Sequence, residues 1–318
     1  MPSIITNRLA LGRQTSFATP VARTRLLRGI ESVTVSPQYE DAVIEESGTT
    51  GVGSFAVLTP RTFEGAIEGA TSYEEILYPL CGLFGVVTPT GSGPYTWTFN
   101  APYLTMPSPQ IYSAEFGVEG FPRLMAGMLY RSLEITSEIG ALRYSADFVA
   151  RDFSAIGSFT TLPVASVNPV SSVHRSLFID TWSGTMGATA VTATLIDATL
   201  AIDTGRHLKV FDGERAGWYG DEKFDIELSL TMEYNSSSDA LIASMLSGVT
   251  QRKIRLRFQD TAARQLDVDF WGTLTGVNEL FSDRDGNATV ELTFRATYHV
   301  ADAQYLRIAV VNGVATLP

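Results

Sequence analysis

The clearest signal in the chain is a strict alternation of apolar and polar side chains. From Phe224 to Tyr234, every second residue is apolar and the residues between are acidic, serine or threonine. The same period of two recurs over residues 142–150 and 290–300. Shorter stretches with this alternation are 254–258 and 266–270. Because successive side chains of a strand point to opposite faces of its sheet, these segments are predicted to be half-buried β-strands.

Two helices are predicted between the strands. A Thr-Ser pair followed three residues later by two glutamates has the form of a capping box and predicts a helix over residues 72–82, ending near Gly82. The serines at 236–238 predict the start of a second helix over 238–247, which ends at Gly248.

The predicted elements occur twice in the same order. The first half has a strand around Val33, a loop at 40–54, a strand at 55–69, the helix at 72–82 and a hairpin closing at Gly140. The second half has a strand around Leu200, a loop at 204–221, a strand at 222–234, the helix at 238–247 and a hairpin closing at Gly286. The order indicates two copies of one mainly β, α+β fold.

A segment rich in Pro, Ser and Thr, residues 154–172, separates the halves. We therefore expect a first domain at 1–160 with an N-terminal arm. A second domain, with its own arm and a C-terminal extension, is expected at 161–318. Residues 88–109, rich in Pro, Gly, Ser and Thr, have no counterpart in the second half and are interpreted as a loop insertion.

Composition agrees with two cores and argues against several kinds of site. The chain has 318 residues, of which 45% are hydrophobic, which suits two domains. Its 34 acidic residues outnumber the 23 basic ones, a balance that disfavours tight binding of phosphates. Cys81 stands alone and is expected to be a buried small apolar residue, and the three histidines have no metal-ligand spacing. No cofactor or metal is expected.

No membrane segment or leader is expected either. The longest apolar run is only a few residues, against the roughly 20 that a spanning helix needs. The first eight residues lack a basic region followed by an apolar one.

One motif could indicate catalysis. Asp203-Thr204-Gly205 follows an apolar strand and matches the D-T-G sequence of aspartic proteases, in which two aspartates share a proton to activate water. The equivalent place in the first half is Ser36-Pro37-Gln38, which offers no second aspartate. The alternative, an ordinary turn after a strand, is favoured.

Two other loops have simple explanations. The alternate acids of 283–287 could suggest calcium, but the loop is too short for an EF-hand, and Asp-Gly between strands predicts a hairpin turn. The glycines of 48–53 resemble a phosphate-binding loop, yet no Lys-Ser or Lys-Thr follows. We expect a flexible loop there.

Acidic residues occupy the polar positions of the longest alternating strands. They are Glu64, Glu68, Asp225, Glu227 and Glu233. These carboxylates either form a solvated sheet face or belong to a surface that repels polyanions.

The overall pattern resembles the tail tube (major tail) proteins of long-tailed bacteriophages, over nearly the whole chain. The residues that carry the resemblance are Leu11–Pro20, Phe63-Glu64-Gly65 leading into Tyr73–Leu77, and Leu228–Leu246. The resemblance implies β-sandwich domains, each flanked by a helix, six of which form a ring lined by a continuous β-barrel. With two domains in this chain, it implies a homotrimer that mimics a hexamer, and rings that stack into a tube conducting DNA from capsid to host.

The resemblance also assigns roles to particular residues. Loops 40–54 and 204–221 would reach the adjacent ring, with Glu45, Glu46, Gly51, Asp212 and Arg215 as candidate contacts. The five strand acids named above would line the lumen and let double-stranded DNA pass without tight binding. Implied partners are further copies of the chain and the tail terminator, tape-measure and tail-tip proteins. The implied location is the virion tail, assembled in the cytoplasm of the host bacterium.

Three alternatives stay open at this stage. A ring adaptor or tail-tip protein of the same fold would form a single ring. An aspartic protease would depend on Asp203. A carbohydrate- or host-binding β-sandwich would use exposed aromatic side chains, for which the candidates are Trp97, Tyr103, Trp182 and Trp218.

Overall fold

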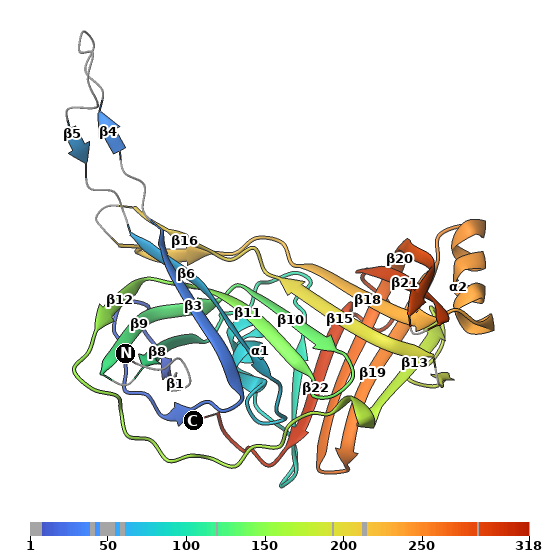
Figure 1. Cartoon of the computed structure of the whole chain (residues 1–318), viewed down its shortest axis with the longest axis horizontal. Coiled ribbons are helices and arrows are strands. Elements are labelled where there is room, and N and C mark those ends of the chain that lie inside the picture. The colour runs from blue at the N-terminus through green and yellow to red at the C-terminus, as the bar shows by residue number, and fades with distance from the viewer. Residues whose placement is uncertain are drawn as a thin grey trace.

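The computed structural model of the chain shows an elongated, mainly β molecule with two halves side by side (Figure 1). The residues that it describes are 8–38, 42–44, 55–57, 61–118, 120–192, 194–211, 215–284 and 286–317. The predicted fold class is confirmed, because most elements are antiparallel strands and two α-helices accompany them.

Among its described residues, the first half contains twelve strands and one α-helix. The strands are β1 (Arg8–Gln14), β2 (Arg25–Leu26), β3 (Ile30–Gln38), β4 (Ala42–Ile44), β5 (Phe55–Val57), β6 (Thr62–Ala70), β7 (Tyr95–Asn100), β8 (Ile111–Val118), β9 (Phe121–Tyr130), β10 (Ser132–Ser137), β11 (Arg143–Ala150) and β12 (Asp152–Ala155). The helix is α1 (Leu77–Phe84).

The described part of the second half contains ten strands and one α-helix, after a 3-10 turn at Ser172–His174. The strands are β13 (Arg175–Thr181), β14 (Ala190–Val191), β15 (Leu195–Asp203), β16 (His207–Lys209), β17 (Trp218–Gly220), β18 (Asp225–Glu233), β19 (Gln251–Thr261), β20 (Arg264–Arg284), β21 (Asn287–Ala296) and β22 (Leu306–Asn312). The helix is α2 (Ser236–Ser247).

One antiparallel ladder runs through both halves, and we call it the shared sheet. Its strands pair in the order β3, β6, β11, β10, β15, β18, β21 and the second part of β20. The pairing of β10 with β15 joins the first half to the second. In the described residues this ladder does not close on itself, because β3 and β20 form its two ends.

Each half has a second layer behind the shared sheet. The first back sheet pairs β2, β1, β8, β9 and β12. The second pairs β14, β13, β19, the first part of β20, β22 and β7. Strand β20 is 21 residues long and belongs to both layers, whereas in the first half the same path is divided between β9 and β10.

The alternation seen in the sequence builds the core between the layers. In β18 the buried side chains are Ile226, Leu228, Leu230 and Met232, and the residues between them are exposed or half-buried. In β11, Tyr144, Ala146 and Phe148 are buried in the same way. In β21 the pattern ends early, since the strand stops at Ala296 and Val300 is exposed, so the predicted extension to 300 was wrong.

The helices differ from their predicted bounds. Helix α1 begins at Leu77 rather than 72, and it ends at Gly85, where φ is 83°, rather than at Gly82. Ser72 Oγ does accept a hydrogen bond from the Glu75 N–H at 3.1 Å, but it closes a turn that precedes the helix. Helix α2 starts at Ser236, capped by the Asn235 side chain, and ends at Gly248 as predicted.

The predicted strand at 55–69 is two strands. Residues 55–57 form β5, which pairs with β4, and β6 begins only at Thr62. The predicted loops at 40–54 and 204–221 likewise contain strand: β4 lies in the first, and the β16–β17 hairpin lies in the second.

The insertion at 88–109 is part of the fold. Its strand β7 pairs with β22 over six residue pairs, so a first-half segment extends the second back sheet. Trp97 in β7 is buried and donates its indole N–H to the Val314 carbonyl oxygen at 2.8 Å. Burial of a side chain of this size stabilises the contact by roughly 2–3 kcal/mol, so the insertion fastens the two halves together.

The predicted linker at 154–172 is extended and attached at its far end. Tyr73 donates its backbone N–H to the Asn168 carbonyl oxygen, and Val170 donates to that of Thr71. The Asn168 amide also donates to a Glu74 carboxylate oxygen at 2.7 Å. These bonds hold the end of the linker against the first half.

Candidate functional site

A row of directly opposed residues crosses the shared sheet. It passes from Glu68 through Ser145, Glu134 and Ala201 to Glu227. Opposed residues in an antiparallel ladder point to the same face. Three glutamates from three different strands therefore lie on one face, the face turned away from the core, which we call the acidic face.

All five predicted acids belong to this face. Glu64 and Glu68 on β6 are exposed, as are Asp225 and Glu227 on β18, and Glu233 at the end of β18 is half-buried. Asp225 forms an ion pair with Arg295 at 2.9 Å, and both side chains are largely exposed.

The sequence analysis missed other acids on the same face. Glu134 lies in the row itself, and Asp147 follows Ser145 by two residues on β11. Asp147 accepts a hydrogen bond from the Ser132 hydroxyl at 2.8 Å. The partner strands of β10 and β11 were not predicted from the sequence. Alternation alone does not show which face of a strand another segment of the chain covers.

The D-T-G motif forms a turn. An Asp203 carboxylate oxygen accepts the Gly205 N–H at 2.7 Å, and the Thr204 hydroxyl donates to the Arg131 carbonyl oxygen. Asp203 lies opposite Asp225 across β15 and β18. The carboxylate is thus engaged in its own turn, as the turn interpretation expects.

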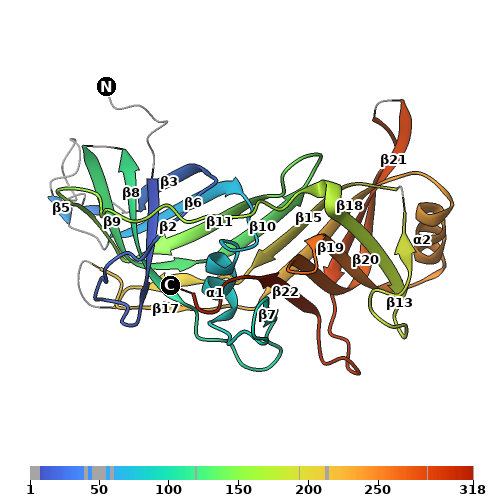
Figure 2. The same cartoon turned by 90° about the horizontal axis from the view of Figure 1, so that it is seen from below.

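The seam between the halves is a six-pair ladder. It runs from Ser132 opposite Asp203 to Ser137 opposite Ala198. Behind it, the ring of Phe84 in α1 stacks on Phe224 of the second half, with ring centroids 5.7 Å apart. Every residue of α1 is buried, and Figure 2 shows the helix at the junction of the two halves.

Arg206 is the polar centre of this junction. Its side chain is only 1% exposed. Its Nη1 donates to the carbonyl oxygens of Gly82 and Tyr130, at 2.7 and 2.8 Å, and its Nε lies 2.6 Å from an Asp221 carboxylate oxygen. A second-half arginine therefore binds two carbonyls of the first half.

The candidate inter-ring residues are described only in part. Glu45, Glu46, Gly51 and Asp212 lie outside the described residues. Arg215 is described, and it forms an ion pair with Asp152 of the first half at 2.9 Å. The β16–β17 hairpin packs against the first half through Ala216 and Tyr219, beside Phe17 and Val149.

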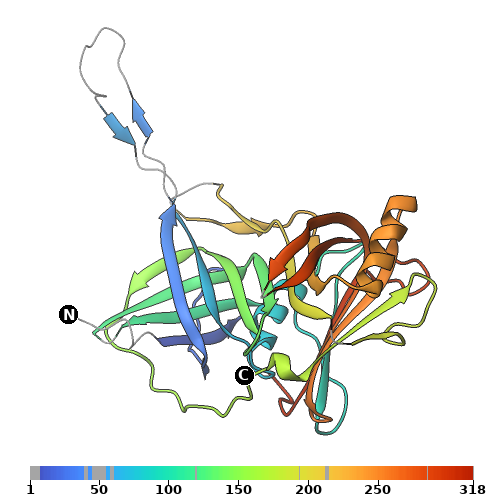
Figure 3. The ribbon, with the colours of Figure 1, turned by 45° about the vertical axis from the view of Figure 1, so that its right-hand side comes forward.

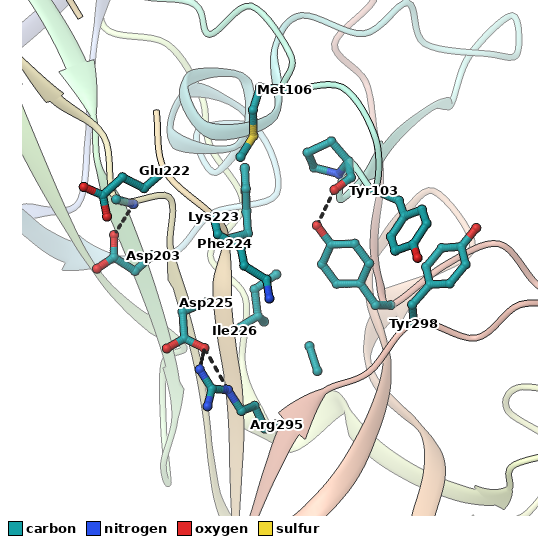
Figure 4. Close-up of a pocket in the computed structure, with 14 residues that line it drawn as sticks. Tyr103, Met106, Asp203, Glu222, Lys223, Phe224, Asp225, Ile226, Arg295 and Tyr298 are labelled. Atoms are coloured by element: carbon teal, nitrogen blue, oxygen red, sulfur yellow. Dashed lines mark hydrogen bonds and ion pairs between the residues drawn. The ribbon is translucent and has the colours of Figure 1, made fainter. Parts of the chain in front are cut away.

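A pocket of about 690 Å³ lies where the insertion meets β18 and β21 (Figure 4). The insertion contributes Tyr103, whose ring stacks on that of Tyr298 at 3.6 Å. The opposite wall carries Asp225 and Arg295. Its lining mixes both charges.

The predicted aromatic binding residues do not form one surface. Trp97 is buried and Trp182 half-buried, whereas Tyr103 and Trp218 are exposed in different elements. Cys81 is buried as predicted, and burial raises the pKa of its thiol to about 12. Burial also raises the pKa of Tyr112 and Tyr130 well above the ordinary value.

The described residues include neither a metal-binding cluster nor a membrane-spanning helix. No group of three or more His, Cys, Asp or Glu side chains comes together there as a metal site would require. None of the described helices has the length and apolar character needed to span a membrane.

Comparison with known proteins agrees with this architecture. No curated protein matches the chain. The family model for phage tail tube proteins matches residues 5–302, which is nearly all of the sequence. The chain, with its two joined β-sandwich halves, therefore belongs to the phage tail tube protein family.

Proposed function

We propose that the chain is a structural subunit of a phage tail tube, that three copies close into a pseudo-hexameric ring, and that stacked rings conduct DNA. The observation that carries this proposal is the seam between β10 and β15. One chain already joins two sandwich units edge to edge, and the shared sheet still has a free edge at each end. A ring of such units leaves no free edge.

The two halves repeat one set of strand pairings, which supports a duplicated unit. In the first half β3 pairs with β6, β6 with β11, β11 with β10, β1 with β8, and β8 with β9. In the second half β15 pairs with β18, β18 with β21, β21 with β20, β13 with β19, and β19 with β20. We assign the first tail-tube domain to residues 1–160 and the second to 161–318. Three two-domain chains then supply the six units.

The acidic face is the proposed wall of the channel. Glu64 of β6 lies opposite Ser36 of β3, and Glu227 of β18 lies opposite Ala201 of β15. Because Ser36 and Ala201 hold the same place in the two halves, the two glutamates hold equivalent positions. Carboxylates repeated around each ring repel the phosphates of passing DNA, and their potential adds up along the tube. Basic side chains would instead bind DNA by releasing its counterions.

The protein acts in the virion tail, after assembly in the cytoplasm of the host bacterium. Its partners are its own copies, the tape-measure protein within the tube, and the terminator and tail-tip proteins at the ends. It needs no cofactor and catalyses no reaction. The loops at 40–54 and 204–221 contact the next ring.

Electron microscopy tests the function directly. Concentrated purified protein is expected to form tubes of stacked rings, and antibody against it is expected to label phage tails along their length. Single rings with label at one end of the tail would favour an adaptor or tail-tip protein instead.

Charge reversal tests the channel wall. Phage carrying Glu64→Lys with Glu227→Lys should assemble intact tails but deliver DNA more slowly. The control is Asp260→Lys, an exposed acid near the end of β19 that forms ion pairs with Arg264 and His174. Normal delivery by the double variant, or an equal defect in the control, would remove the channel assignment and leave the tube.

A further inference from the structure

We infer that β20 of one copy pairs with β3 of the next copy in the register of the internal seam, so that Asn278 lies opposite Ser36. The inference rests on the proposed ring. It adds which strands meet, which residues face each other and which other surface is covered.

The first step establishes which residue of β3 corresponds to which residue of β15. Strand β3 pairs with β6, and β15 with β18, and both ladders carry a register shift at their start, after Ile30 and after Leu195. Beyond the shift, Ser36 is the fourth residue after Ser32, and Ala201 is the fourth after Asp197. Ser36 therefore takes the place of Ala201. Gln38, rather than the Ser36 expected from the sequence, takes the place of Asp203.

The second step does the same for β10 and β20. Gly65 of β6 corresponds to Leu228 of β18, and these residues lie opposite Phe148 and Phe294. Three residues before each phenylalanine are Ser145 and Glu291. Ser145 lies opposite Glu134, and Glu291 lies opposite Asn278. Asn278 therefore takes the place of Glu134.

The internal seam then fixes the register between copies. Glu134 lies opposite Ala201 within the chain, so Asn278 of one copy is placed opposite Ser36 of another. Gly276 and Val277 then lie opposite Gln38 and Pro37. Proline lacks an N–H, so this ladder has one donor fewer than the internal one.

Exposed apolar side chains beside the open edge favour a partner there. Leu280 and Phe281 lie at the register shift of β20 and are 46% and 61% exposed. Leu246 of α2 is 84% exposed, although the corresponding helix α1 is buried throughout. Figures 1 and 3 show α2 at the outer end of the second half, the end at which β20 leaves its edge free.

The occupant is a second copy of this chain. Helix α1 is covered by the second half, through Phe224 and Arg206, in the same junction that contains the β10–β15 ladder. A copy that adds its β3 to β20 brings its first half over α2 in the same way. Because β3 and β20 are the two ends of one sheet, each copy offers both surfaces and the contacts close into a ring.

Disulfide trapping tests the register. In the internal seam, Thr204 donates its N–H to the Arg131 carbonyl oxygen, so these two residues form a hydrogen-bonded pair. Hydrogen-bonded and non-hydrogen-bonded pairs alternate along an antiparallel ladder. Glu134 and Ala201 lie three pairs away and therefore form a pair without mutual hydrogen bonds. Such pairs bring side chains closest together. We expect Ser36→Cys with Asn278→Cys to give covalent dimers and trimers on mild oxidation of the assembled full chain.

Two further cysteine pairs serve as controls for the register. Glu134→Cys with Ala201→Cys should form a disulfide inside one chain, without higher species on a non-reducing gel. Thr34→Cys with Asn278→Cys, two residues out of register, should give roughly tenfold less product, because the side chains are then too far apart for S–S geometry. Native Cys81 is buried and remains as a constant background. If the double variant folds poorly, the two single variants can be mixed before assembly, and only their heterodimer should cross-link.

The possible outcomes separate this inference from the proposed function. Efficient cross-linking of the Thr34 pair, or none at Ser36 in protein that forms tubes, would overturn the register and leave the tube subunit. Absence of rings and tubes in the unmodified protein would overturn both.

Discussion

Arg206→Met offers a direct test of how the two halves are held together. Methionine has a similar length but donates no hydrogen bond. The change removes the donors that reach the carbonyl oxygens of Gly82 and Tyr130, and it removes the charge partner of Asp221. Arg206 is buried, so no water replaces these bonds without rearrangement.

The magnitude follows from what is left unpaired. A buried acceptor that loses its donor costs about 1–3 kcal/mol, so two carbonyls amount to roughly 2–6 kcal/mol. The Asp221 side chain is 16% exposed and can be hydrated, which limits its share. A loss of about 3–5 kcal/mol in unfolding free energy is expected, in the range measured for broken buried ion pairs. For a chain of 318 residues, with an unfolding entropy of about 2.1 cal/mol/K per residue, that corresponds to a fall in Tm of about 4–8 °C.

Urea unfolding followed by circular dichroism, with the protein dilute enough to remain dissociated, measures the change. The matched control is Arg295→Met, which removes an exposed ion pair with Asp225 and should cost less than about 1 kcal/mol. If Arg206→Met loses no more than the control, the buried arginine contributes nothing net to the seam. The argument from unpaired carbonyls would then fail.

Two further predictions concern α1. Gly82→Ala should lower Tm, although alanine has the better helix propensity, because its Cβ would overlap the Tyr130 ring. The expected loss of unfolding free energy is about 1–3 kcal/mol. An unchanged or higher Tm would contradict the close packing of α1 on Tyr130. Cys81 should resist a thiol reagent at pH 8, because a thiol with a pKa of about 12 is almost wholly protonated there. It should react once urea unfolds the chain. Rapid labelling of the native protein would show that α1 opens readily.

The equivalence of the halves also explains a difference between them. Val149 of β11 and Arg295 of β21 occupy the same place, opposite Glu64 and Glu227. Val149 is buried because the β16–β17 hairpin covers it, whereas Arg295 is largely exposed and pairs with Asp225. The β16–β17 hairpin thus shields from water the apolar residue that stands at this place on the acidic face.

The sequence by itself determined the features that depend on neighbours along the chain. Alternation placed Ile226 and Leu228 in the core and Asp225 and Glu227 outside it, because strand geometry alone sets which face a side chain takes. The Gly248 stop of α2 was predicted for the same reason, since a helix end is a local event. The extent of several elements was misjudged, as at the start of α1, and β4, β7, β16 and β17 lie in segments that were predicted to be loops.

Only the tertiary structure decided which strands are neighbours. The pairing of β10 with β15, the addition of β7 to β22, and the reach of Arg206 into the first half each join residues 60 or more positions apart. Hydrophobic period carries no information about the partner of a strand, because any strand edge offers the same N–H and C=O groups. Shape and packing of the whole chain select the partner, and among the described residues they leave the outer edges of β3 and of the second part of β20 unpaired.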